Sequence, residues 1–323
     1  MLPQAEHARW LNAAAALAFR AIPASAPNPS VAAIIVKDGV VLGRGWTAQG
    51  GRPHAEAAAL KQAGKAAKGA ALYVTLEPCA HASDRGPACA AITAAAGVSQ
   101  VVIGCLDPDP RTNGKGIGKL RDAGIDVTLM DHAACRASLS GFLTREAKSR
   151  PHVTLKLAVS ADGFIGPRTG HPVTITGHAA RAHVHRQRAL HEAILVGGAT
   201  LRNDAPRLDV RLPGLEHCSP ERFVLTRGNA PAGWNALSSP EAISNLLPRQ
   251  SLYVEGGGAT AQAFLKAGLV DELHIYRAPK ELGEGIAAYG ALGPASNGAP
   301  PPGFTLIDQR RIGSDMLHIY RPA

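Results

Sequence analysis

The sequence predicts an α/β protein built from two domains. Its 323 residues are about twice the length of a typical domain. Short apolar runs of strand length alternate with segments of helical periodicity, as in sheets covered by helices. Ser149-Arg150-Pro151 interrupts this alternation. We therefore expect one domain in residues 1–148 and a second in residues 151–323.

The strands of the first domain are predicted from apolar runs bounded by Gly, Pro or Asp. These runs are Val31–Val36, Val40–Trp46, Ala71–Leu76, Gln100–Ile103 and Ile125–Leu129. Asp38-Gly39 joins the first two runs and favours a tight hairpin turn. Beyond an amphipathic first helix, helical patterns cover His54–Ala63, Pro87–Ala96, Ile117–Ala123 and His132–Lys148.

The second domain shows the same alternation and ends in a strand-rich segment. Its predicted strands are His152–Val159, Ala193–Val196, Arg222–Leu225, Ser251–Val254, Glu272–Arg277, Phe304–Asp308 and Met316–Tyr320. Helical patterns cover His178–Leu190 and Thr260–Ala267. The Gly- and Pro-rich stretch Gly290–Gly303 is predicted to be a surface loop.

Charge and cysteine content narrow the functional class. The formal net charge of +9 attracts polyanions, anionic surfaces or phosphorylated small ligands. No stretch approaches the roughly 18 apolar residues of a membrane helix, and Glu6, Asn12 and Arg20 argue against a signal peptide around the apolar run Leu11–Phe19. Five cysteines, an odd number in a long chain, indicate a reducing compartment. We expect a cytoplasmic protein with no membrane partner.

Three residues at the ends of predicted elements form a candidate zinc site. His54 opens a helix, Cys79 follows a strand, and Cys89 lies at the start of another helix. One imidazole and two thiolates leave the fourth position open, as in catalytic zinc sites, where the metal makes hydroxide available near pH 7. Glu56, two residues after His54, can move a proton from water to a leaving amine, as zinc deaminases require.

Two non-catalytic interpretations of these residues, a packing role and a structural zinc site, remain open. A lone His or Cys usually serves packing. A structural zinc would need a fourth protein ligand, for which His81 or Cys105 is available. The combination of a His-Ala-Glu and a Pro-Cys string, each at an element end, favours the catalytic interpretation.

In the second domain two strands run into glycines. Leu252–Val254 leads into Glu255-Gly256-Gly257-Gly258, and Ala193–Val196 leads into Gly197-Gly198-Ala199-Thr200. Bare backbone amides at a helix N-terminus can approach a phosphate, although a tight turn explains such glycines equally well. His183, His185 and His191 lie on an Arg-rich helix, but the first two face different ways, which disfavours a metal site.

The chain resembles the bifunctional riboflavin-biosynthesis deaminase/reductase family over nearly its whole length. The matching strings occur in order in both halves. They are Asn28-Pro29-Ser30-Val31, PHAE at 53–56, KGAALYVTLEPC at 68–79, DPDPRTNGKGI at 107–117, LKLAVSADG at 155–163, AILVGGAT at 193–200, YVEGGG at 253–258 and GLVDEL at 268–273.

The resemblance implies a cytidine-deaminase-like three-layer domain followed by a dihydrofolate-reductase-like domain, with Zn²⁺ and NADPH as cofactors. It implies zinc ligands at His54, Cys79 and Cys89 and a catalytic Glu56. The cofactor residues implied are Thr176, Thr200, Asp204, Gly256, Gly257 and Gly258. The substrate residues implied are Asn28, Lys156, Arg188, Leu208, Arg211 and Glu255. The substrate would be a small phosphorylated pyrimidine, deaminated and then reduced from a ribosyl to a ribityl compound, with no nucleic-acid partner; a homo-oligomer is compatible with the sequence.

Some positions depart from the family pattern. Gly45-Trp46-Thr47 stands where the pocket loop usually has a His, and Asp109, between Pro108 and Pro110, stands where an Asn is usual. In the reductase half, Pro172 and Thr174 replace a Ser and a Trp, and the stretch between Leu225 and Leu252 is short for a strand–helix unit. These departures leave open a member of the family whose reductase domain is degenerate or repurposed.

Rivals from other functional classes also remain open. A nucleic-acid base deaminase with a basic RNA-binding domain would share the zinc strings and the positive charge, although aromatic side chains for base stacking make up only 4% of the chain. A binding module with only a structural zinc is a further alternative.

Overall fold

The computed structural model describes residues 3–82, 85–168, 173–290 and 301–323. It divides into two compact units, Met1–Ser149 and Arg150–Ala323. The last helix of the first unit ends at Ser149, whose φ of 50° is left-handed. None of the described helices is long and apolar enough to cross a membrane.

The first unit contains a five-stranded sheet in the order β2-β1-β3-β4-β5. The pairs β2–β1 and β1–β3 are antiparallel, whereas β3, β4 and β5 are parallel. The strand bounds are β1 Ala32–Lys37, β2 Val40–Trp46, β3 Ala71–Val74, β4 Gln100–Ile103 and β5 Asp126–Leu129. The predicted hairpin is confirmed, because Asp38 and Gly39 both adopt the positive φ that such a turn requires.

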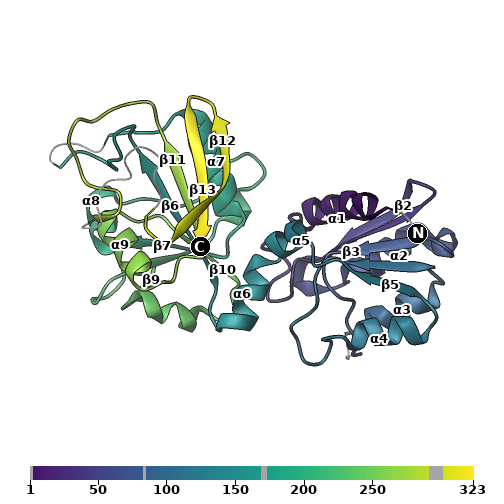
Figure 1. Ribbon diagram of the computed structural model, residues 1–323. Helices are drawn as coiled ribbons and strands as arrows, with labels where there is room; N and C mark the ends of the chain where they lie inside the picture. Colours follow the sequence, from purple (N-terminus) through teal and green to yellow (C-terminus); the bar gives the residue numbers. More distant parts are fainter. Residues whose placement is uncertain (1–2, 83–84, 169–172, 291–300) are drawn as a thin grey trace. The chain divides into compact units, whose positions relative to one another are not determined.

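Helices cover both faces of this sheet. In Figure 1, α1 lies along one face and α3 and α4 lie along the other. The helix bounds are α1 Gln4–Ala18, α2 Ala55–Ala63, α3 Cys89–Ala95, α4 Lys115–Asp122, α5 Ala133–Ser138 and α6 Ser140–Lys148, with 3-10 turns at Gln49–Gly51 and Gly64–Ala67. Trp10 and Leu11 of α1 are buried in the core, as an amphipathic first helix requires.

The prediction of one helix over His132–Lys148 is wrong. The structure has two helices, which meet at Leu139 with φ −107° and ψ 7°. The Leu139 side chain is buried in the core of the unit, and Ser140-Gly141, a residue pair at which helices commonly kink, follows it directly.

The second unit contains an eight-stranded sheet in the order β12-β13-β11-β6-β10-β7-β8-β9. The six strands from β11 to β9 are parallel, and β13 and β12 continue the sheet antiparallel. The strand bounds are β6 His152–Val159, β7 Ala193–Gly197, β8 Glu221–Leu225, β9 Asn235–Leu237, β10 Ser251–Val254, β11 Glu272–Arg277, β12 Phe304–Ile312 and β13 Asp315–Pro322.

This sheet has a hydrophobic core on each face. Alternation along β10 places Leu252 and Val254 in one core with Phe264 of α9, and Tyr253 in the other with Val184 of α7. The helix bounds are α7 His178–Ala189, α8 Gly198–Asp204 and α9 Gly258–Lys266, with 3-10 segments at Glu216–Cys218 and Pro240–Leu246.

The short stretch between Leu225 and Leu252 still forms an ordered crossover. It contains β9 and a 3-10 segment, Pro240–Leu246, in place of a full strand–helix unit. Ile243 and Leu246 of that segment are buried in the core. The predicted loop Gly290–Gly303 falls mostly, and Pro172 wholly, outside the described residues.

Candidate functional site

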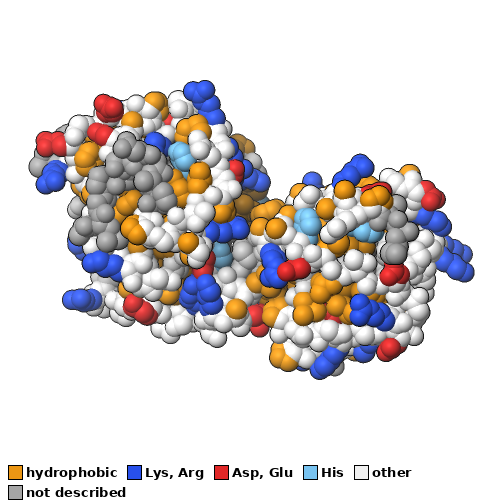
Figure 2. Space-filling model, viewed as in Figure 1, with side chains coloured by type: hydrophobic (Ala, Val, Ile, Leu, Met, Phe, Trp, Pro, Cys, Tyr) orange, Lys and Arg blue, Asp and Glu red, His pale blue; other side chains and the backbone are white. Residues whose placement is uncertain are grey.

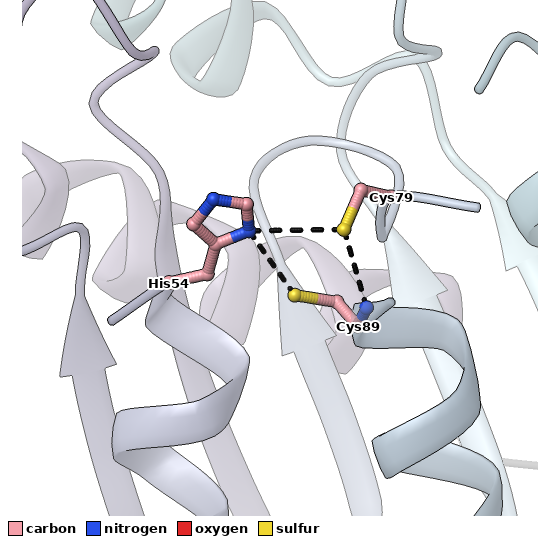
Figure 3. A group of neighbouring side chains, drawn as sticks. All are labelled: His54, Cys79 and Cys89. Atoms are coloured by element: carbon pink, nitrogen blue, oxygen red, sulfur yellow. Dashed lines mark hydrogen bonds between the residues drawn. The ribbon is translucent and has the colours of Figure 1, made fainter. Parts of the chain in front are cut away.

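Three side chains from separate elements converge in the first unit. His54 directly precedes α2, Cys79 follows β3, and Cys89 is the first residue of α3. Figure 3 shows the His54 ring pointing between the two sulfur atoms. His54 Nδ1 lies 3.2 Å from Cys89 Sγ and 3.7 Å from Cys79 Sγ, and the Cys89 backbone N–H donates to Cys79 Sγ at 3.2 Å.

These donors fit a zinc ion. Their ligand atoms lie within 4.8 Å of one another, and tetrahedral zinc bonds of about 2.0–2.3 Å separate neighbouring ligands by roughly 3.5–3.8 Å. Hydrogen bonding from Cys89, followed by that from His54, lowers the pKa of the Cys79 thiol to about 4. A soft, thiolate-rich set of three donors is typical of zinc sites that keep one position open.

Neither candidate fourth ligand joins this group. Among the described residues, the cluster of possible metal ligands consists of His54, Cys79 and Cys89. Neither His81 nor Cys105 belongs to this cluster. His81 Nδ1 instead lies 3.5 Å from Thr112 Oγ1, and Cys105 is 2% exposed within the hydrophobic core. The arrangement therefore corresponds to an open site rather than a closed structural one.

The predicted catalytic carboxyl faces the same cavity. A pocket of about 350 Å³ is lined by His54, Glu56, Cys79 and Asn28. Glu56 belongs to the first turn of α2 and is only 3% exposed. Burial raises its pKa to about 7, although the neighbouring His54 charge opposes the shift. Asn28 donates from Nδ2 to the Gly51 carbonyl at 3.2 Å, which holds one edge of the pocket.

Much of the cavity wall comes from residues that the sequence analysis did not single out as ligands. Glu77 and the Asp107–Arg111 segment lie on the loops that follow β3 and β4. These two strands are parallel neighbours, so both loops leave the sheet at the same edge. Further side chains that line the pocket are the guanidinium groups of Arg52, Arg85 and Arg145 and the imidazole of His81.

Both departures in this pocket have structural roles. Thr47 is buried, donates to the Pro29 carbonyl at 2.9 Å and accepts from the Val31 backbone N–H at 3.0 Å, which ties the Asn28-containing segment to β2. Asp109 accepts hydrogen bonds from the Arg111 backbone N–H at 2.9 Å and from the Arg111 guanidinium at 2.6 Å, and the side-chain hydrogen bond lowers the pKa of Asp109.

In the second unit, the predicted substrate residues surround one buried carboxylate. Arg188 Nε and Nη2 donate to the two oxygens of Glu255 at 2.6 and 3.0 Å, and Lys156 Nζ lies 3.8 Å from Glu255 Oε2. Burial opposes ionisation of Glu255, but the Lys156 and Arg188 charges outweigh it and lower its pKa. Burial in turn lowers the pKa of Lys156.

His185 and Asp209 connect this cluster to Arg211. Arg188 Nη1 donates to the Asp209 carbonyl at 2.9 Å, and Arg211 Nη2 lies 3.3 Å from His185 Nε2. Leu208 is buried beside Asp209 with a φ of 54°, a strained value for leucine. His185 was predicted not to bind a metal, and among the described residues it belongs to no cluster of possible metal ligands. Its contacts with Arg211 and Asp209 were not predicted from the sequence.

The predicted cofactor residues form a second group. Because β7 and β10 are parallel neighbours, Thr200 of α8 and the glycines that open α9 come together. A side chain at Gly257 would begin 3.5 Å from Thr200 Oγ1, and one at Gly258 would lie 2.5 Å from the Ala287 carbonyl. The N-terminus of α9, where glycines leave the backbone amides uncovered by side chains, is suited to a phosphate group.

The remaining two cofactor candidates are more peripheral in the structure. Asp204 is exposed at the end of α8. Thr176 precedes α7 and accepts a hydrogen bond at its carbonyl from Arg181 Nη1 at 2.6 Å. Asp204 lies one helical turn after Thr200 in α8, on the same side of that helix.

Two family models match the two units. Residues 4–105 match the cytidine and deoxycytidylate deaminase zinc-binding region, and residues 151–318 match the RibD C-terminal domain. The "Riboflavin biosynthesis protein RibD" of Escherichia coli is 36% identical over 344 residues, covering 91% of this chain and 93% of that protein.

The chain belongs to the RibD family. RibD proteins are bifunctional enzymes of riboflavin biosynthesis with a zinc-binding deaminase domain and a reductase domain, and this chain has both. A solved RibD structure from Acinetobacter baumannii matches with a TM-score of 0.84 at 32% identity, covering 98% of this chain and 99% of that one.

A second RibD-like structure extends the comparison. The Thermotoga maritima protein described as a diaminohydroxyphosphoribosylaminopyrimidine deaminase/5-amino-6-(5-phosphoribosylamino)uracil reductase matches with a TM-score of 0.87 at 29% identity, covering 98% of this chain and 99% of that one. The expected combination of a cytidine-deaminase-like and a reductase unit is thus confirmed. The rival classes, an RNA-binding base deaminase and a binding module, are not favoured.

The surface adds a further observation about charge. On the face shown in Figure 2, described Lys and Arg side chains are interspersed with Asp and Glu and do not form one continuous stripe.

Proposed function

We propose that the first unit hydrolyses the amino group of 2,5-diamino-6-ribosylamino-4(3H)-pyrimidinone 5′-phosphate and that the second reduces the deaminated product with NADPH. The first half is supported chiefly by one cavity lined by Glu56 and by two zinc-type donors, His54 and Cys79, with the ligand atom of the third donor, Cys89, within 4.8 Å of theirs. The second half is supported by the RibD C-terminal match and by the charged cluster around Glu255.

His54, Cys79 and Cys89 would hold the zinc ion. When bound, zinc supplies a hydroxide nucleophile near neutral pH. Glu56, which lines the cavity beside these donors, takes the proton of the attacking water and returns it to the leaving nitrogen. The C–N bond breaks, a carbonyl replaces the amine, and ammonia leaves. Asn28 holds the pocket edge on which the pyrimidine is oriented.

In the second unit, we assign cofactor contacts to Thr176, Thr200, Asp204 and the glycines Gly256, Gly257 and Gly258. Lys156, Arg188, Leu208, Arg211 and Glu255 would contact the phosphorylated substrate. NADPH supplies a hydride to C1′ of the ring-opened ribosylamine, and a proton completes the ribitylamine. Arginine is well suited to bidentate binding of phosphate, and Arg211 is half exposed beside the buried Arg188–Glu255 pair.

Two separate assays test the two halves. Zinc-loaded protein should release ammonia from the diaminopyrimidinone substrate, and chelator-treated protein should not. Independently, the deaminated intermediate should support sustained NADPH oxidation. Ammonia release without any NADPH oxidation would instead support a degenerate reductase unit, and failure of both would overturn the proposal.

A further inference from the structure

Glu77 is a buried carboxylate that receives hydrogen bonds from a neighbouring loop. It precedes the zinc-ligand candidate Cys79 by two residues and is 3% exposed. Its Oε1 accepts from the Ile117 backbone N–H at 3.0 Å, and its Oε2 accepts from the Gly114 N–H at 3.0 Å and the Asp107 N–H at 3.4 Å. Both oxygens are thus engaged by the backbone of residues 107–117.

The segment held by Glu77 forms one wall of the deaminase cavity. Asp107, Asp109 and Arg111 all line it. Their positions are linked in series, because Asp107 Oδ1 accepts from the Asp109 N–H at 2.9 Å and Asp109 accepts from the Arg111 N–H at 2.9 Å. The Arg111 guanidinium also donates to both oxygens of Asp109. We call Asp107–Arg111 the polar wall.

Two further contacts fix the same segment to the Cys79 strand end. Gly116 packs so closely that a Cβ there would lie 2.1 Å from the Pro78 carbonyl oxygen. Lys119 Nζ donates to the Ala80 carbonyl at 2.6 Å. The zinc-ligand segment and α4, which follows the polar wall in the chain, are therefore joined on both sides of Cys79. Glu77 makes the central connection and also contacts the first residue of the polar wall, through the Asp107 N–H.

We propose that Glu77 is a positioning residue that sets the distance and orientation of the polar wall relative to the zinc donors, and so the binding of the pyrimidine substrate. This inference rests on the proposed deaminase function. Glu77 acts through the backbone of the wall, because its own oxygens are occupied. A merely structural carboxylate would change stability and zinc content, whereas a positioning residue changes substrate binding while the metal and the fold are retained.

The substitution Glu77→Gln tests this role with little change in volume. The amide group replaces one acceptor oxygen with a donor, so at least one backbone N–H loses its partner. We expect the KM of deamination to rise about tenfold or more, as for loss of a hydrogen bond to a charged group, with a smaller change in kcat. Zinc content and NADPH oxidation by the same molecules should match the unsubstituted enzyme.

A matched control and a second variant complete the test. Asp126→Asn neutralises a carboxylate of the same sheet that accepts from Gln100 and does not line the cavity, and it should leave the KM unchanged. Gly116→Ala keeps the Glu77 carboxylate in the sequence but places a Cβ 2.1 Å from the Pro78 carbonyl oxygen and 3.0 Å from Glu77 Oε1. It forces the segment away from both, so it should also raise the KM.

The outcomes separate the inference from the proposed function. Absence of ammonia release by the unsubstituted zinc-loaded enzyme would refute the deaminase proposal itself. With that enzyme active, an unchanged KM in Glu77→Gln overturns the positioning role. Zinc loss or unfolding that parallels the loss of activity in both variants also overturns it, since Glu77 would then serve the fold alone.

Discussion

The two candidate sites are assembled in different ways. In the first unit, one imidazole and two cysteine sulfurs from three elements converge on a volume suited to an ion, and their ligand atoms lie within 4.8 Å of one another. In the second unit, the charges already compensate one another, because Arg188 and Lys156 surround Glu255. The first site therefore depends on a metal for its chemistry, whereas the second is built from the chain's own ion pairs. This difference predicts that the two activities can be lost separately.

Metal removal should give the largest difference between the deaminase and reductase activities. Chelation of zinc should reduce ammonia release to background, because the three donors cannot activate water by themselves. NADPH oxidation with the deaminated intermediate should stay unchanged, and zinc addition should restore ammonia release. A parallel loss of both activities would show that the second unit also depends on the metal.

Glu56→Gln should give the second-largest difference between the deaminase and reductase activities. An amide cannot accept and return the proton, so ammonia release should fall by about 10²- to 10⁴-fold. Metal analysis should still find zinc, since Glu56 is not one of the three donors. A variant that retains zinc and deaminates at the normal rate would exclude Glu56 as the proton carrier.

Glu255→Gln should affect the other unit. Removal of its charge leaves Arg188 and Lys156 without their buried anion, which typically lowers the free energy of unfolding by about 3–5 kcal/mol. Reductase kcat/KM should fall while ammonia release is retained. Glu281→Gln, at an exposed position of the same unit, is the control. Equal free energies of unfolding of the two variants in urea would show that Glu255 does not compensate the charges of Arg188 and Lys156.

A smaller effect is expected at Glu272, in the second unit. Burial opposes its ionisation, but the hydrogen bond from His274 and the charges of His274, His152 and Arg321 outweigh burial and lower its pKa from 4.5 to about 2. Because the folded-state pKa is depressed, the ionised form stabilises the fold above pH 4.5, and this contribution is lost as the pH falls toward 2.

Glu272→Gln measures this contribution. Near pH 7 the substitution should lower the free energy of unfolding by about 3 kcal/mol at most, the value of a shift of this size. In urea titrations at successive pH values, the difference between variant and unsubstituted protein should shrink between pH 4.5 and 2. A difference that stays constant over this range would contradict the assigned pKa.

Locally encoded features were predictable from the sequence. The Asp38-Gly39 hairpin follows from the turn preference of two adjacent residues. The bounds of β4, β6, β10 and β11 agree with the apolar runs, because buried parallel strands are nearly continuous in hydrophobic residues. The proximity of His54, Cys79 and Cys89 was predictable because each lies at the end of an element with a recognisable local string.

Features that depend on long-range packing were not predictable in the same way. The break at Leu139 is followed by Ser140-Gly141, but such a pair also occurs within continuous helices, and the buried Leu139 side chain depends on packing in the core. The polar wall joins the deaminase cavity only because β3 and β4 are neighbours in the sheet. Similarly, the contact of Arg211 with His185 depends on the loop after α8 returning to α7. Residue spacing alone does not specify these contacts.

If the deaminase and reductase sites of this chain both work, one substrate should pass through both reactions in a single sample. Zinc-loaded protein is supplied with a limiting amount of the diaminopyrimidinone ribosylamino phosphate and excess NADPH, and ammonia and NADPH absorbance are followed in the same sample. We expect one ammonia released and one NADPH oxidised for each substrate molecule consumed. Ammonia release with no NADPH oxidation, or neither signal, would contradict the claim that both sites work.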